Sequence, residues 1–249
     1  MSCITDLSGR KLLITGASSG IGRATAVLAA ALGASVVACG RDKSRLDETL
    51  SLMENPERHS SVCFDVRDFG SYDSVFTAAT ADGRKLDGMV HCAGIAKVTP
   101  LRTMKPETIT ELLETNLSSF IMLSSYYSKR KYSAGGSIVG ISAANSHIPH
   151  KCMSVYAATK AAIEAAVRTM AVELAAQDIR INCVIPGAVD TRMAGNTDEE
   201  MLSRIEKQHL LGMLQPESIA HFIAFLLSDA SKAVTGRAIW ADGGMLGQA

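Results

Sequence analysis

The chain has 249 residues, of which 47% are apolar, and its 25 basic residues balance its 25 acidic ones. This length suits one large α/β domain with a substantial core, and the charge balance argues against nucleic-acid or anionic-membrane partners. No segment resembles a signal peptide, and no apolar run approaches the roughly 20 residues that span a bilayer. The six cysteines form no CxxC pair and no metal-ligand spacing, which predicts a reducing, cytoplasmic location and no metal site.

Seven short apolar segments rich in Val and Ile alternate with helix-like segments. They are KLLITG (11–16), SVVACG (35–40), SVCFDV (61–66), LDGMVHCAG (86–94), GSIVGIS (136–142), RINCVIPG (180–187) and RAIWADGG (237–244). Near-continuous apolar strands are typical of a parallel sheet covered on both faces. We therefore expect one α/β domain over residues 1–249, a Rossmann-type, doubly wound, seven-stranded parallel sheet with helices on both faces. The irregular stretch at about 188–214 is expected to form a substrate lid.

The first strand-like segment leads directly into TGASSGIG (15–22). In this strand–turn–helix context, Gly16 permits a tight turn, Gly20 lets the backbone approach a pyrophosphate, and Gly22 allows the helix to pack near the sheet. The N–H groups at the start of the helix then face the anion. The motif predicts a dinucleotide site formed by Gly16, Ser18, Ser19, Gly20, Ile21 and Gly22.

The end of the second strand-like segment indicates which dinucleotide binds. An NAD site has an acidic residue here for the ribose hydroxyls, whereas this chain has Arg41 after Gly40. The planar donor fork of arginine suits a 2′-phosphate, so NADP(H) is expected in preference to NAD(H). The acid that follows, Asp42, is expected to cap the next helix.

SVYAATK (154–160) places Tyr156 and Lys160 one turn apart on the same face of an expected helix. A free phenol has a pKa near 10, and an ammonium about 5 Å away favours the phenolate by roughly 3 kcal/mol at an effective dielectric near 20. We therefore expect Lys160 to lower the pKa of Tyr156 by about two units and to make the phenol a general acid or base. The spacing alone is not specific, because such pairs also occur on ordinary surface helices.

Two polar residues lie where they can join this pair. Ser142 ends the fifth strand-like segment, where its hydroxyl would hold a carbonyl oxygen beside the phenol. Asn116 lies within an expected helix, although asparagine is a poor helix former. Its side chain can compete with the backbone ladder, kink the helix and hold a water; an ordinary exposed asparagine is the alternative.

Together these motifs resemble the short-chain dehydrogenase/reductase family. The resemblance rests on TGASSGIG, FDV (64–66), HCAG (91–94), Asn116, Ser142, YAATK (156–160) and PGAVDT (186–191), and it covers nearly the whole chain. It implies an oxidoreductase that interconverts a carbonyl and a secondary alcohol with a nicotinamide cofactor. It also implies four catalytic residues, of which all but Ser142 contact the cofactor as well: Asn116, Ser142, Tyr156 and Lys160.

The resemblance assigns further cofactor contacts. Those to the adenosine half are Asp65, Val66, Ala93 and Gly94. Those to the nicotinamide and its phosphate are Pro186, Gly187, Val189 and Thr191, and a helix cap is the alternative role for Thr191. HCAG replaces the family's more usual Asn-Asn-Ala-Gly, and we expect His91 to be an interior histidine with satisfied hydrogen bonds.

The chain is most similar to bacterial 3-oxoacyl-[acyl-carrier-protein] reductases, in ETNLSS (114–119), PGAVDT and ADGGM (241–245). A 3-oxoacyl thioester is therefore one expected substrate. Ser133 and Gln177 stand at positions matched to carrier-binding arginines, and the nearby cations are Arg130, Lys131 and Arg180. A reductase of a small ketone, a sugar or a polyketide-like carbonyl fits equally well, and a non-catalytic dinucleotide-binding redox sensor is the alternative from another class.

The substrate pocket is expected from its residue types, and the oligomer is implied by the resemblance. An apolar, adaptable pocket wall is predicted from Met153, Met193, Met201, Leu210, Leu211, Met213 and Leu214. Packing between helices is the alternative role for most of these methionines. The family usually forms homotetramers or homodimers through two long helices, predicted here at about 106–130 and 153–177. Small residues along the second of these helices would permit close packing.

Overall fold

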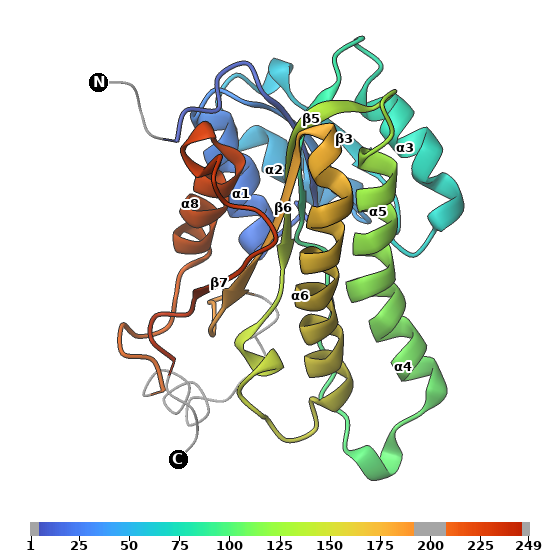
Figure 1. The fold of residues 1–249 in the computed structure, drawn as a ribbon, viewed down its shortest axis with the longest axis vertical. Coiled ribbons are helices and arrows are strands. Elements are labelled where there is room, and N and C mark those ends of the chain that lie inside the picture. Colours follow the sequence, from blue (N-terminus) through green and yellow to red (C-terminus); the bar gives the residue numbers. More distant parts are fainter. Residues whose placement is uncertain (1–4, 192–207, 246–249) are drawn as a thin grey trace.

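The computed structural model describes residues 5–191 and 208–245. Seven strands form one parallel sheet in the order β3-β2-β1-β4-β5-β6-β7. Their bounds are β1 Lys11–Thr15, β2 Ser35–Gly40, β3 Ser60–Cys63, β4 Leu86–His91, β5 Ser133–Ile141, β6 Ile179–Pro186 and β7 Ala238–Ala241. The predicted seven-stranded, doubly wound sheet is confirmed, and Figure 1 shows it between two layers of helices.

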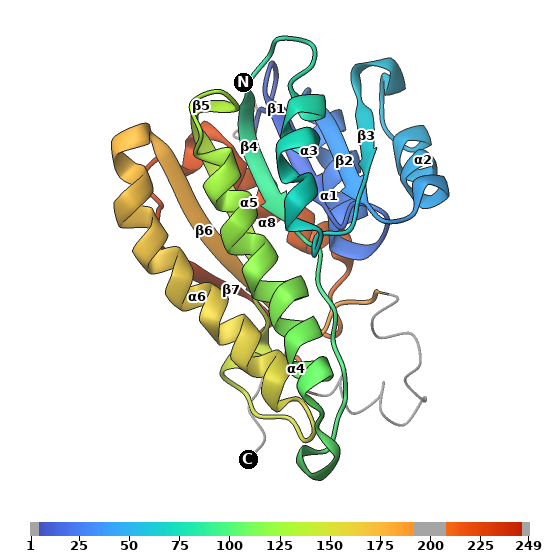
Figure 2. The ribbon, with the colours of Figure 1, turned by 90° about the vertical axis from the view of Figure 1, so that its right-hand side faces the viewer.

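Helices cover both faces of the sheet (Figure 2). One face carries α1 (Gly20–Ala31), α2 (Lys43–Ser51) and α8 (Pro216–Leu227), and the other carries α3 (Tyr72–Ala79), α5 (Ser119–Tyr127) and α6 (Ser154–Leu174). Helix α4 (Pro106–Leu113) packs against α6. Short 3₁₀ turns are η1 Pro56–Arg58, η2 Phe69–Ser71, η3 Leu101–Thr103, η5 Ala144–Ser146, η6 Ala175–Gln177 and η7 Asp229–Ser231.

Two apolar cores result from alternation along the buried strands. In β1 every residue is buried, but Leu12 and Ile14 pack with α1 and α8, whereas Leu13 packs with α3 and α5. Successive strand side chains point to opposite faces, so a continuous apolar run supplies both cores. At the sheet edge this pattern ends, because Cys63 on the edge strand β3 is exposed.

The strand order creates a crevice where a ligand can bind. After the edge strand β3 the chain crosses to β4 on the other side of β1, so the connections that follow β1 and β4 diverge. Open α/β sheets bind ligands at this switch point, beyond the carboxyl ends of the strands. The glycine turn follows β1 at this point, and residues 92–94 follow β4.

The predicted long helix at 106–130 is an α-helix interrupted by a π turn. Helices α4 and α5 run end to end beside α6 (Figure 2), and the π segment η4 (Glu114–Ser118) joins them. Such turns are rare and often occur at functional sites. Within the two described ranges, no helix is both long and apolar enough to cross a bilayer.

Candidate active site

The glycine turn after β1 packs closely against its neighbours because glycine has no side chain. Gly16 has a φ of +68°, and a Cβ there would lie 2.7 Å from the Ala93 backbone nitrogen. A Cβ on Gly22 would lie 2.3 Å from the Gly16 carbonyl oxygen. Both distances are too short for any real Cβ, so the turn and the first helix can pack this closely only with glycine at these positions.

The N-terminus of α1 is arranged to receive an anion. Ser19, its N-cap residue, makes no side-chain capping bond, and the first turn has no acidic residue. The first N–H groups of a helix have no partner within the helix and attract negative charge. Thr191 lies beside this turn, because a Cβ on Gly20 would be 3.0 Å from Thr191 Cγ2.

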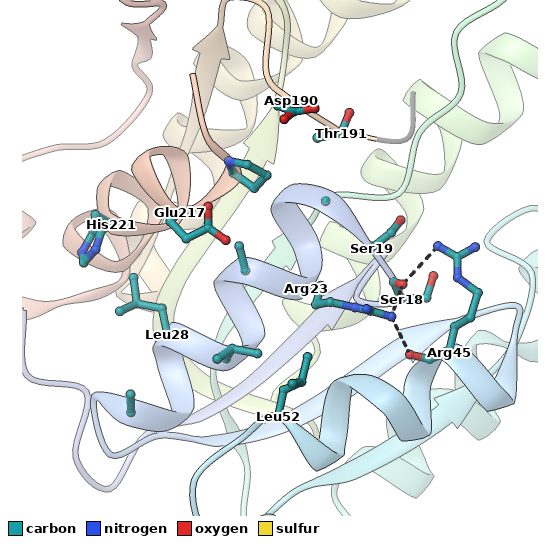
Figure 3. Close-up of a pocket in the computed structure, with 15 residues that line it drawn as sticks. Ser18, Ser19, Arg23, Leu28, Arg45, Leu52, Asp190, Thr191, Glu217 and His221 are labelled. Carbon is teal, nitrogen blue, oxygen red and sulfur yellow. Dashed lines mark hydrogen bonds between the residues drawn. The ribbon is translucent and has the colours of Figure 1, made fainter. Parts of the chain in front are cut away.

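Two arginines hold the glycine turn in place by hydrogen bonds. Neither was predicted as a site residue. Arg23 and Arg45 both donate to the Ser18 carbonyl oxygen, at 2.9 and 3.1 Å. They lie beside a cavity of about 620 Å³ between α1, α2 and the start of α8 (Figure 3). None of the four expected catalytic residues lines this cavity, although it borders Ser18, Ser19 and Gly20. Neither arginine belongs to the glycine motif, so the motif gave no signal for them.

The adenosine end of the crevice carries a charged cluster. Arg41 is 65% exposed at the end of β2, and its Nη1 lies 4.0 Å from Asp65 Oδ2. Asp65 also accepts a 2.7 Å hydrogen bond from Arg67, which together with its other contacts lowers the pKa of Asp65. Asp42 accepts from the backbone N–H of Arg45, so the predicted helix cap is confirmed. Val66, beside Asp65, is buried.

Asn116 is fully buried in the π turn and holds the chain after β4 in place. Its Oδ1 accepts from the Ile95 N–H at 2.8 Å, and its Nδ2 donates to the Ile95 carbonyl and to Thr159 Oγ1. The alternative of an ordinary exposed asparagine is therefore wrong. Gly94 lies between Asn116 and Lys160, since a Cβ there would be 3.4 Å from Asn116 Oδ1 and 3.6 Å from Lys160 Nζ.

Tyr156 and Lys160 are both buried on α6, and the Lys160 Nζ lies 5.7 Å from the centroid of the Tyr156 ring. Lys160 Nζ donates to the Ile141 carbonyl at 2.7 Å, at the end of β5. Burial lowers the pKa of Lys160 to about 8, which leaves the amine largely charged at pH 7. The sequence spacing thus places the pair together as expected.

The expected lowering of the Tyr156 pKa is wrong for the protein alone. Burial raises the pKa of Tyr156 to about 12. The expectation rested only on the attraction between ammonium and phenolate, whereas the cause of the shift is burial, which disfavours the charged phenolate. At neutral pH the hydroxyl therefore keeps its proton and can act as an acid.

Ser142 is buried at the end of β5 and donates to the Glu164 carboxylate at 2.6 Å. Glu164 also lies on α6, one turn after Lys160, and the sequence analysis missed it. His91 is likewise buried, with Nδ1 2.9 Å from Thr15 Oγ1 and Nε2 3.1 Å from Ser119 Oγ. Burial lowers the pKa of His91 to about 3, so it is the interior histidine that was expected.

The segment after β6 is held by pairing with residues near the end of the expected lid. Val189 bridges Leu214, and the Leu214 N–H donates to the Ala188 carbonyl. Gly187 packs against His209, because a Cβ there would lie 2.6 Å from His209 Nε2. Pro186 ends β6. Most of the lid, with Met193 and Met201, lies outside the described residues, while Leu210 and Leu211 are exposed.

These features fit a nicotinamide dinucleotide. The uncapped helix N-terminus suits a pyrophosphate, and the exposed Arg41 guanidinium suits a phosphate on the ribose. The buried ammonium of Lys160 lies beside Gly94, which has no side chain of its own in the path of a ribose. Within the described ranges, no group of His, Cys, Asp and Glu side chains could hold a metal ion.

Comparisons with known proteins agree with this geometry. A family model described as Enoyl-(Acyl carrier protein) reductase matches residues 16–246. The chain is 34% identical to a 3-oxoacyl-[acyl-carrier-protein] reductase of Thermotoga maritima, over 96% of this chain and 99% of that protein. It is 33% identical to a cis-4-hydroxycyclohexanecarboxylate dehydrogenase of Sinomonas cyclohexanicum, over 94% and 96%.

A solved structure supports the same family assignment. A short-chain type dehydrogenase/reductase from Mycobacterium ulcerans superimposes with a TM-score of 0.89 at 29% identity, over 96% of this chain and 92% of that chain. The chain therefore belongs to the short-chain dehydrogenase/reductase family and is an oxidoreductase that acts on CH–OH groups.

Proposed function

We propose that the protein is an NADPH-dependent reductase that converts a carbonyl to a secondary alcohol, with Tyr156 as the general acid. The observation that carries this proposal is the pair of buried side chains on α6, with the Lys160 ammonium 5.7 Å from the Tyr156 ring at the carboxyl end of the sheet. A protonated phenol beside a cation is suited to give its proton to an oxygen that becomes negative.

Each residue has a role in this proposal. NADPH, when bound, supplies the hydride. Tyr156 donates its proton to the substrate oxygen as negative charge develops there, and Ser142 holds the same oxygen. Lys160 stabilises the charge left on Tyr156, and Asn116 fixes the backbone at Ile95 beside Gly94. The other expected cofactor contacts, among them Arg41 for the 2′-phosphate, are part of the same proposal.

The proposed substrate class is a 3-oxoacyl thioester, with a small ketone, sugar or polyketide-like carbonyl as the alternative. The named relatives act on chemically different substrates, a 3-oxoacyl carrier thioester and a cyclic alcohol. Recognition of a carrier protein would depend on the cations near Ser133 and Gln177. Arg180 donates to three backbone carbonyls and is not free for a carrier, whereas Lys131, which pairs with Asp73 at 2.7 Å, and Arg130 are both exposed.

NADPH oxidation with a panel of carbonyls tests the proposal. The panel contains acetoacetyl-coenzyme A, cyclohexanone, an acyclic ketone and a ketose, each tested with NADPH and with NADH. Turnover of at least one carbonyl, with NADPH preferred, is the expected result. Tight NADPH binding without turnover of any carbonyl would refute the proposal and favour the redox sensor.

We further propose a cytoplasmic homotetramer or homodimer formed through α4, α5 and α6. The outer faces of these helices expose apolar side chains, namely Ile109, Leu113, Ile121, Met122 and Val172. Covering them in an oligomer would remove this surface from water. Light scattering after size-exclusion chromatography tests the assembly, and a monomer at micromolar concentration would contradict it.

A further inference from the structure

Glu164 is a buried carboxylate to which the proposed reaction assigns no role. It lies on α6 and is 4% exposed. Its oxygens accept hydrogen bonds from Ser142 Oγ at 2.6 Å, Ser146 Oγ at 2.6 Å and His147 Nε2 at 2.8 Å. Burying a carboxylate is unfavourable unless such donors satisfy it. One of these donors is the residue expected to hold the substrate oxygen.

The single proton of Ser142 has two acceptors within reach. Glu164 Oε1 lies at 2.6 Å and the Lys160 carbonyl oxygen at 3.1 Å. A distance of 2.6 Å is typical of a hydroxyl that donates to a carboxylate, the stronger kind of hydrogen bond. The Lys160 carbonyl also lies inside α6, where the helix supplies it with a backbone donor. The proton therefore points to Glu164, and Ser142 offers a further ligand only its lone pairs.

A carbonyl oxygen can accept hydrogen bonds but cannot donate them. For Ser142 to hold it, as the proposed function requires, the hydroxyl proton has to leave Glu164. Building on that function, we propose that Glu164 is a positioning residue that competes with the substrate carbonyl for the single proton of Ser142. This competition weakens carbonyl binding relative to alcohol binding, because an alcohol hydroxyl can donate to Ser142 while the serine proton stays on Glu164.

His147 modulates this competition from the other oxygen of the carboxylate. Its Nε2 lies 2.8 Å from Glu164 Oε2, and its ring lies against Trp240, with ring centroids 4.9 Å apart. A donor at Oε2 satisfies part of the negative charge and so reduces the demand on the Ser142 proton. Loss of this donor would strengthen the hold of Glu164 on Ser142. Substitutions at the two positions should therefore have opposite effects.

The test compares Glu164→Gln with Glu173→Gln, which changes an exposed carboxylate on the same helix. Glutamine keeps the shape and removes the charge, so competition for the Ser142 proton weakens for either orientation of the amide. With acetoacetyl-coenzyme A and cyclohexanone as probes, the carbonyl KM should fall about fivefold in E164Q and stay constant in E173Q. His147→Phe, which keeps a ring against Trp240, should raise KM about twofold.

A double mutant separates this role from a structural one. In a Ser142→Ala background, E164Q should leave the carbonyl KM unchanged, because the proton at issue is absent. An equal or higher KM in E164Q than in the unmodified protein, or the same shift with and without Ser142, would overturn the inference. Thermal unfolding of each variant confirms that it is folded.

A binding measurement makes the result independent of turnover. Dissociation constants of the two probes are measured in Tyr156→Phe saturated with NADPH, with Glu or with Gln at position 164. Tighter binding with Gln supports the inference, and equal or absent binding overturns it. Failure of the proposed function is seen separately, as the lack of NADPH oxidation by the unmodified protein with every carbonyl in the panel.

Discussion

The two regions of the proposed site, a cofactor side and a substrate side, are built in different ways. On the cofactor side, the surface is formed by backbone and by missing side chains, as where the Gly16 turn meets Ala93. On the substrate side, buried polar side chains on α6 and at the end of β5 form a connected set. The first region therefore depends on backbone shape and the second on the placement of protons. Substitutions in the first should impair cofactor binding, and substitutions in the second should impair the chemical step.

Replacing Tyr156 with Phe should abolish most of the catalysis on the substrate side and leave cofactor binding intact. We expect kcat for carbonyl reduction to fall about 10³-fold, the range of general acid catalysis, because no other described group replaces the phenol proton. NADPH affinity should stay within about twofold, since the change removes only one hydroxyl. Steady-state kinetics and a fluorescence titration with NADPH measure the two effects. Activity close to that of the unmodified protein would rule out the role of the phenol.

Replacing Arg41 with Ala should weaken the preference for NADPH over NADH. Loss of a charge-assisted contact to the 2′-phosphate should reduce the preference for NADPH over NADH about thirtyfold, with NADH affinity unchanged. Arg102→Ala, which removes an exposed arginine on η3, is the control. A preference that survives in Arg41→Ala would assign the phosphate to Arg45, whose Nε is buried without a partner among the described residues.

Reductive activity should fall at high pH because Lys160 loses its charge. Burial lowers the pKa of Lys160 to about 8 and raises that of Tyr156 to about 12. As pH rises through 8 the lysine loses its charge while the phenol keeps its proton. The kcat for reduction should therefore drop about tenfold between pH 7 and 9. Lys160→Arg keeps a cation at these pH values, so an identical fall in that variant would assign the titration to another group.

The difference between the two regions also explains what could be predicted from sequence. The order of strands and helices and the glycine turn follow from apolar periodicity and from residues with special backbone freedom. The Tyr156–Lys160 pair follows from helical spacing. These are local properties, and the structure agrees with them. The direction of the Tyr156 pKa shift was predicted wrongly. It depends on the burial of the side chain in the folded protein, which helical spacing does not indicate.

The same limit applies to Glu164 and to the arginines around Ser18. Glu164 is one acidic residue in a helix rich in alanine, and only the fold brings it to Ser142 and His147. Arg23 and Arg45 come from two helices and meet at one carbonyl oxygen (Figure 3). Contacts between residues far apart in the chain decide these roles, so the single sequence held no signal for them.

His91 lies between the two regions, where it contacts Thr15, the last residue of β1, and Ser119, which follows the π turn. Burial lowers its pKa to about 3 in the folded protein, against an ordinary value of 6.5. Below pH 6.5 the unfolded chain therefore binds a proton that the folded protein excludes, and the free energy of unfolding falls as the pH is lowered toward 3.

Replacing His91 with Asn should remove this part of the acid sensitivity. Between pH 7 and 5.5 the unmodified protein should lose about 1 kcal/mol more of its free energy of unfolding than the variant, as measured by urea titration at each pH. His221→Asn, which changes an exposed histidine on α8, should behave like the unmodified protein. If all three proteins lose stability equally, the buried imidazole takes up its proton without unfolding, and the connection between the two regions tolerates a charge.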